Sequence, residues 1–92
     1  MPDRLQEKSE QGSVILSVQC KMARAAIGLG VRELSELSGV STDTIVRFER
    51  GEVLRSRTIE AIRTALEAAG VIFIQQNGDG PGVRLKKDHV GR

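Results

Sequence analysis

The chain has 92 residues, which suits one small domain, because separate hydrophobic cores usually need about 100 to 200 residues each. Hydrophobic residues make up 39% and charged residues 28%, and no apolar run approaches the ~20 residues that cross a bilayer, so we expect a soluble cytoplasmic protein. With Cys20 as the only cysteine and His89 as the only histidine, an intramolecular disulfide and a structural zinc site are excluded.

The charge balance is weak evidence for a polyanionic partner, since the formal net charge is only +2. Aromatic residues are 2% of the chain, too few to stack the bases of single strands or RNA loops. No Ser-His-Asp set, paired carboxylates or metal cluster can be assembled, so we expect neither an enzyme nor a cofactor. The glycine-rich segment NGDGPG lacks the Lys-Ser/Thr pair of a phosphate-binding loop and is typical of a turn.

The two ends of the chain are polar. Residues 1–13 contain only Leu5 as an isolated aliphatic residue beyond the first methionine, and we predict a flexible arm there. Residues 88–92, which include His89, are predicted to be a flexible tail.

Between these ends, apolar residues at helical spacing predict four helices. The first follows Ser17, a plausible N-cap, and ends at Gly28; its apolar face comprises Leu16, Cys20, Ala23 and Ile27, so Cys20 is expected to be a packed core thiol.

The second and third predicted helices are short and closely spaced. The second covers Val31–Ser38, with Leu34 and Leu37 at helical spacing, and Gly39 ends it. The third covers about residues 42–50, with Ser41 as N-cap and with Ile45 and Phe48 facing inward. Two short helices around a tight glycine turn are what a helix-turn-helix needs.

A fourth helix and a hairpin complete the predicted elements. The helix begins near Ser56 or Thr58 and ends at Gly70, with Ile59, Ile62, Leu66 and Ala69 at helical spacing. Residues 71–74 form a short β-branched and aromatic run, the turn cluster of residues 77–82 follows, and residues 83–85 alternate, so this segment predicts a β-hairpin. An isolated hairpin is marginal in water, so we expect it to pack on the helices or on a second copy. We expect residues 71–87 to form a homodimer interface, through Val71, Ile72, Phe73, Ile74, Val83 and Leu85.

The segment from residue 22 to residue 51, MARAAIGLGVRELSELSGVSTDTIVRFERG, strongly resembles the Xre/Cro/C1 family of helix-turn-helix transcriptional regulators. The tail GVIFI…NGDGPGVRL is similar to that of small proteobacterial members, and the resemblance covers about residues 16–87. It implies a mainly α fold, in which a four-helix, lambda-repressor-like helix-turn-helix domain at residues 14–70 precedes a short C-terminal β-hairpin.

The resemblance also implies a DNA-reading helix, because in this family the third helix lies in the major groove. The matching base-contact positions are Thr42, Asp43 and Arg47. Arg47 can bind guanine bidentately, and Thr42 can bond either kind of base edge or touch a thymine methyl. For Asp43 two interpretations stay open: it accepts from cytosine N4, or it only serves the positive end of its helix dipole.

Phosphate contacts in the family come from the start of the second helix and from the loop after the third. The matching positions carry Arg32, Thr44, Arg50, Arg55 and Arg57, although a solvated protein surface would also be rich in arginine. Many members have Gln at the first position of the second helix, where this chain has Val31, so one expected phosphate anchor is missing. The family's pairing of an Arg in the first helix with a Glu near the end of the third implies a partly buried salt bridge between Arg24 and Glu49, with a structural role.

The sequence thus predicts a sequence-specific double-stranded DNA-binding transcriptional regulator, most simply a repressor, that reads a palindromic operator as a homodimer. The alternative is a protein-interaction module on the same scaffold, such as an antitoxin or an antiactivator that binds another regulator, because fold alone does not determine function.

Overall fold

Four helices occupy the segments with helical spacing, and two strands follow Gly70. The computed structural model describes residues 14–75 and 78–87, so the predicted arm at 1–13 and the predicted tail with His89 lie outside the described residues. The elements, in chain order, are α2 (Ser17–Ile27), α3 (Val31–Ser38), α4 (Thr42–Glu49), α5 (Ser56–Ala68), β1 (Val71–Ile74) and β2 (Gly82–Leu85). Within the part of the chain that the structure describes, four helices and an antiparallel hairpin make up the mainly α class that the sequence predicted.

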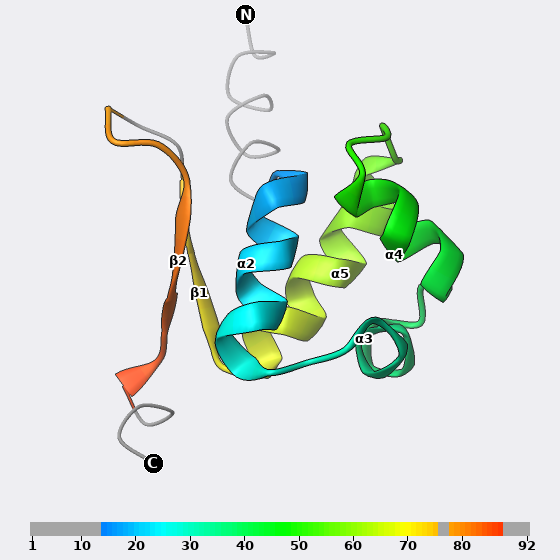
Figure 1. Ribbon diagram of the computed structural model, residues 1–92, viewed down its shortest axis with the longest axis horizontal. Coiled ribbons are helices and arrows are strands. Elements are labelled where there is room, and N and C mark those ends of the chain that lie inside the picture. Colours follow the sequence, from blue (N-terminus) through cyan, green and yellow to red (C-terminus); the bar gives the residue numbers. More distant parts are fainter. Residues whose placement is uncertain (1–13, 76–77, 88–92) are drawn as a thin grey trace, which may run out of the picture.

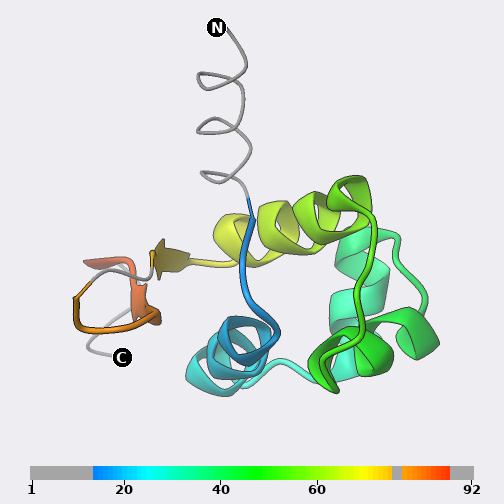
Figure 2. The same ribbon diagram turned by 90° about the horizontal axis from the view of Figure 1, so that it is seen from above.

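The helices and the hairpin follow one another across the long axis of the molecule. Helices α2 and α5 lie in the middle, α3 and α4 lie at one end, and the hairpin lies against α2 at the other (Figures 1 and 2). The surface of α4 is therefore well separated from the strands. Within the described residues, no helix combines the length and the apolar character needed to cross a membrane.

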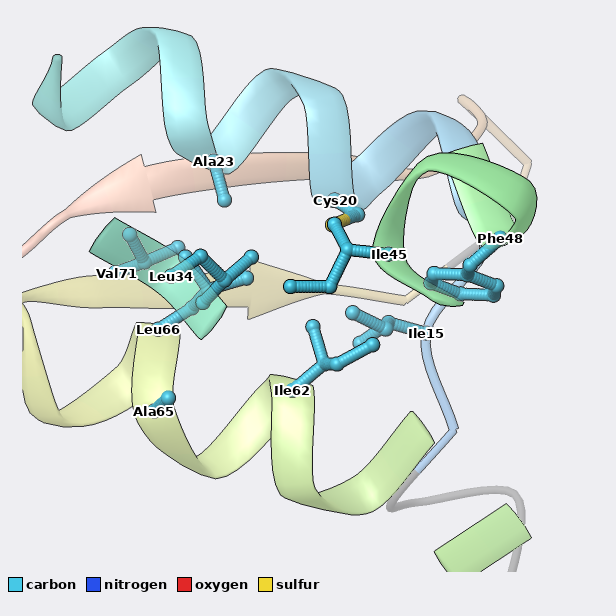
Figure 3. Close-up of a cluster of buried hydrophobic side chains, with 10 residues drawn as sticks. All are labelled: Ile15, Cys20, Ala23, Leu34, Ile45, Phe48, Ile62, Ala65, Leu66 and Val71. Carbon is cyan, nitrogen blue, oxygen red and sulfur yellow. The ribbon is translucent and has the colours of Figure 1, made fainter. Parts of the chain in front are cut away.

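The core forms where the four helices and β1 converge. Its buried side chains point toward one another in Figure 3: Ile15, Cys20, Ala23, Leu34, Ile45, Phe48, Ile62, Ala65, Leu66 and Val71. The predicted inward positions Ile45 and Phe48 of α4, and Ile62 and Leu66 of α5, are confirmed.

Two apolar positions were assigned wrongly from the sequence. Leu16 is 42% exposed, whereas its neighbour Ile15 is 2% exposed and belongs to the core. Leu16, and not Ser17, is the N-cap of α2, and its extended backbone takes it out of the helical period. Leu37 is 59% exposed, because the buried side of the short helix α3 is centred on Leu34.

The hairpin packs on the helices with one of its two faces. Val71 opposes Leu85, and Phe73 opposes Val83. Val71 is buried, and the other three side chains are partly buried against the core, so this face is used within the chain. Ile72 opposes Arg84 on the other face, where both are exposed. Of the predicted dimer residues, Ile72 and Ile74 lie on this second face, whereas Val71, Phe73, Val83 and Leu85 lie on the face that packs within the chain.

Gln19 attaches the first turn of α2 to the hairpin. Its buried side chain donates from Nε2 to the carbonyl oxygens of Ile74 (2.9 Å) and Gly82 (3.1 Å), the last residue pair of the strand ladder. Its Oε1 accepts from the Leu16 N–H at 2.8 Å and so caps the helix. No local pattern in the sequence indicates this role of Gln19, because its partners are 55 and 63 positions away.

We expect Gln19→Glu to lower the free energy of unfolding at neutral pH by about 1 to 3 kcal/mol. The substitution keeps the acceptor for the Leu16 N–H but turns a carboxylate oxygen toward two carbonyl oxygens that lose their donor. Urea unfolding of both proteins measures the difference. A loss of unfolding free energy below about 0.5 kcal/mol, which is typical of surface substitutions, would show that the Gln19 hydrogen bonds contribute little to stability.

Candidate nucleic-acid interface

The turn between α3 and α4 is held by its own short hydrogen bonds. Gly39 ends α3 with a positive φ of 78°, and its N–H donates to the Ser35 carbonyl at 2.8 Å. Ser41 then caps α4, because its Oγ accepts from the Thr44 N–H at 3.1 Å, as the sequence predicted. Helix α4 therefore begins four residues after the end of α3 and at a defined angle to it.

Helix α4 has a buried face and a polar outer face. Ile45 and Phe48 fix it to the core, and Glu49 is buried near its end. The three predicted base-contact residues lie on the outer side: Thr42 and Asp43 are exposed, and the Arg47 side chain is 43% exposed. The structure thus brings these three residues together on one short helix.

Arg47 contacts two carboxylates. Its Nη1 donates to Asp43 Oδ2 at 3.1 Å, one helical turn away. Its Nε is buried and lies 3.3 Å from Glu52 Oε1, an ion-pair contact without hydrogen-bond geometry. Asp43 therefore has a partner besides the helix dipole. Glu52 was missed in the sequence, since no helical spacing relates it to Arg47.

The predicted phosphate contacts are distributed around α4. Arg32 lies in α3, Arg50 is the C-cap of α4, Arg55 is the N-cap of α5 and Arg57 follows in its first turn. All four are exposed, and within residues 14–75 and 78–87 none of them forms an ion pair. Thr44 differs from them, because it is half-buried and its hydroxyl accepts from Ser41 Oγ at 2.8 Å.

Arg24 and Glu49 form a bidentate pair behind the exposed face of α4. Arg24 Nε donates to Glu49 Oε2 at 2.8 Å, and Arg24 Nη2 donates to Oε1 at 2.7 Å. The Glu49 side chain is 8% exposed and that of Arg24 is 22% exposed. A third arginine donor, Nη1, reaches the Leu29 carbonyl at 3.1 Å. The ion pair connects the last turn of α4 to α2, and the third arginine donor connects α2 to Leu29, which lies just after the end of α2.

Cys20 adds a third member to this cluster, since its Sγ donates to Glu49 Oε2 at 3.1 Å. Burial raises the pKa of the Cys20 thiol far above its usual value, and the hydrogen bond to Glu49 and the carboxylate charge raise it further. The thiol therefore stays protonated, as expected for a core residue with low reactivity.

The charge of Glu49 is stabilised by its partners. Burial alone would raise the pKa of this carboxyl, but the hydrogen bonds from Arg24 and Cys20, with the positive charges of Arg24 and Lys21, outweigh burial and lower it. The hydrogen bond to Glu49 raises the pKa of Arg24. Both side chains are thus charged at neutral pH.

The described residues hold no group of three His, Cys, Asp or Glu side chains that could bind a metal ion. No protein-family model matches the chain, and a search of curated proteins found no match either. A function for this chain has to be inferred from its own residues.

Proposed function

We propose that the protein is a sequence-specific double-stranded DNA-binding transcriptional regulator of the Xre/Cro/C1 type, a cytoplasmic repressor that reads a palindromic operator as a homodimer. One observation carries the proposal: α4 is entered from a tight capped turn, is anchored from behind by Arg24 and Glu49, and carries three polar side chains outward. A recognition helix needs this combination of a fixed orientation and an exposed polar face.

The dimensions and charges of this end of the molecule support the proposal. An α-helix such as α4 is about 10 to 12 Å in diameter with its side chains, and the major groove of B-DNA, about 12 Å wide, admits a helix of this diameter. Arg32, Arg50, Arg55 and Arg57 flank it with exposed guanidinium groups that suit phosphates on either side of a groove. In this proposal Thr44 contributes less than the arginines, because it is half-buried and uncharged.

Dimerisation is proposed through the outer face and an open edge of the hairpin. Ile72 is 39% exposed there, and a two-stranded sheet leaves unpaired backbone groups along both of its edges. A symmetric pair of copies would present two α4 helices related by a two-fold axis, and such a protein matches a palindromic site whose half-site spacing is set by the distance between the two helices.

Selection of bound duplexes from a randomised library at about 0.15 M salt tests this proposal. We expect an enriched palindrome, and a plot of log K against log salt with a slope of roughly −4 to −5. This slope corresponds to about four to six phosphate contacts per dimer, that is, to two or three of the four arginines in each protomer. Arg57→Gln should make the slope shallower by about 1 to 2, because it removes one phosphate contact per protomer.

Arg63→Gln is the matched control, since Arg63 pairs with Glu67 on α5 and is neither a predicted phosphate contact nor part of the hairpin. It should leave the slope unchanged. If a folded wild-type protein enriches no sequence, the DNA-binding proposal is wrong.

The second candidate is a protein-interaction module such as an antitoxin or an antiactivator. A shallow groove between α3 and α5 favours it, because the exposed Leu37 lies there beside Arg57, Glu60 and Ala61. An exposed apolar patch rimmed by polar groups is typical of a protein-interaction site, and this candidate replaces the first if no duplex is enriched.

A further inference from the structure

The guanidinium of Arg47 lies between the carboxylates of Asp43 and Glu52, at 3.1 Å and 3.3 Å. The three side chains together carry a net charge of −1, so a phosphate approaching Arg47 also meets two negative groups. The edge of a base carries no net charge and avoids this repulsion. The surroundings of Arg47 therefore suit a base contact better than a backbone contact.

The backbone at the end of α4 determines where Glu52 lies. Gly51 has a φ of 101°, which favours glycine, and its N–H donates to the Phe48 carbonyl at 2.9 Å. The Glu52 N–H donates to the Arg47 carbonyl at 3.0 Å. These two bonds form a Schellman turn, which brings the sixth residue back over the first. Glu52 is thus held beside Arg47 by main-chain bonds.

The two carboxylates leave one edge of the guanidinium available. Nε faces Glu52, and Nη1 uses one N–H for Asp43. The remaining N–H groups of Nη1 and Nη2 have no acceptor among the described residues. Two parallel donors on this edge match the two acceptors, O6 and N7, that guanine presents in the major groove. Adenine and cytosine each place an amino donor there and would repel the arginine.

We propose that Glu52 and Asp43 are positioning residues, which hold Arg47 so that the edge formed by Nη1 and Nη2 reads one guanine in each half-site. This inference rests on the proposed DNA-binding function and adds a base and two supporting residues to it. Glu52 and Asp43 restrict a long flexible side chain before DNA arrives, so less conformational freedom is lost on binding. They also weaken the attraction of Arg47 for phosphates in the wrong register.

The test measures guanine preference, not only affinity. Enriched duplexes from the wild-type selection are resynthesised with each of the four bases at every position, and binding is compared for wild type, Arg47→Ala, Glu52→Gln and Asp43→Asn. We expect wild type to prefer guanine at one position per half-site by about 5- to 150-fold, the range for one bidentate pair. Arg47→Ala should lose this guanine preference. Glu52→Gln and Asp43→Asn should each lower the guanine preference of the wild type by about fivefold or more.

Glu36→Gln is the control for charge, because Glu36 is an exposed carboxylate of α3 without a contact to Arg47. It should leave the guanine preference unchanged. If Glu52→Gln and Asp43→Asn keep the full preference, or if Arg47→Ala keeps it, the positioning role is wrong while DNA binding stands. If the wild type enriches no sequence at all, both the proposed function and this inference are wrong.

Discussion

Glu49→Ala should lower the free energy of unfolding by about 3 kcal/mol, within the range for breaking a buried ion pair from one side. The substitution removes the acceptor of two hydrogen bonds from Arg24 and one from Cys20. Arg24 is partly exposed, and water can reach part of its guanidinium, which limits the loss. At about 4 to 8 °C per kcal/mol for a domain of this size, the melting temperature should fall by more than 10 °C.

Acid should weaken the same interaction. Because the pKa of Glu49 is lowered in the folded chain, its contribution is complete above the usual glutamate value of 4.5. The contribution declines below that pH, since the unfolded chain takes up a proton first, and it is gone once the pH is below the folded-state pKa. Unfolding measured between neutral and acidic pH should therefore show a shallower acid dependence for Glu49→Ala than for wild type.

Glu67→Ala is the matched control, because Glu67 pairs with Arg63 one turn earlier on the surface of α5. A helical surface pair of this kind contributes at most about 0.5 kcal/mol. If Glu49→Ala lowers the free energy of unfolding by no more than Glu67→Ala does, the bidentate pair of Arg24 and Glu49 does not anchor α4.

Leu34→Ala should lower the free energy of unfolding by about 3 to 4 kcal/mol, which is in the usual range for replacing a fully buried leucine. Leu34 has no exposed surface and points into the centre of the core, where α3 meets the other helices (Figure 3). The neighbouring side chains come from separate, rigid elements and cannot collapse fully into the space, so a cavity term adds to the lost transfer free energy. Denaturant unfolding, with the m-value compared, measures the loss.

Leu37→Ala makes the same chemical change three residues later in the same helix. Since Leu37 is 59% exposed, we expect Leu37→Ala to change the free energy of unfolding by no more than about 0.5 kcal/mol. Equal losses for the two variants would contradict the orientation of α3 on the core. Because α3 leads into α4 through a three-residue turn, this orientation also determines where α4 points.

Local interactions explain why much of the fold could be predicted from the sequence. Helical spacing and the glycine that ends the helix gave Val31–Ser38 as a helix, and the hydroxyl of Ser41 gave the start of α4. The β-branched and aromatic run after Gly70, with the turn cluster that follows it, predicted the antiparallel hairpin. Spacing, capping and turn formation each involve residues a few positions apart, and such interactions can be recognised in one dimension.

The candidate site could be predicted only in part. The positions of Thr42, Asp43 and Arg47 on one helix followed from resemblance and spacing, and so did the match of Arg24 with Glu49. The second carboxylate beside Arg47 could not be predicted, because Glu52 reaches it around a Schellman turn whose geometry depends on the positive φ of Gly51. The thiol hydrogen bond to Glu49 was also beyond the sequence, since it joins α2 to α4.

The helices, the capped turn, the hairpin and the kinds of side chain on α4 follow from the order of residues along the chain, because each depends on close neighbours. The packing of distant elements explains why Ile15 and not Leu16 enters the core, why Leu37 stays exposed, and why Gln19 joins α2 to the hairpin. It also decided which face of the hairpin is used within the chain and which residues surround Arg47. These outcomes depend on how distant elements pack, and packing is set by the shape and burial of the whole core.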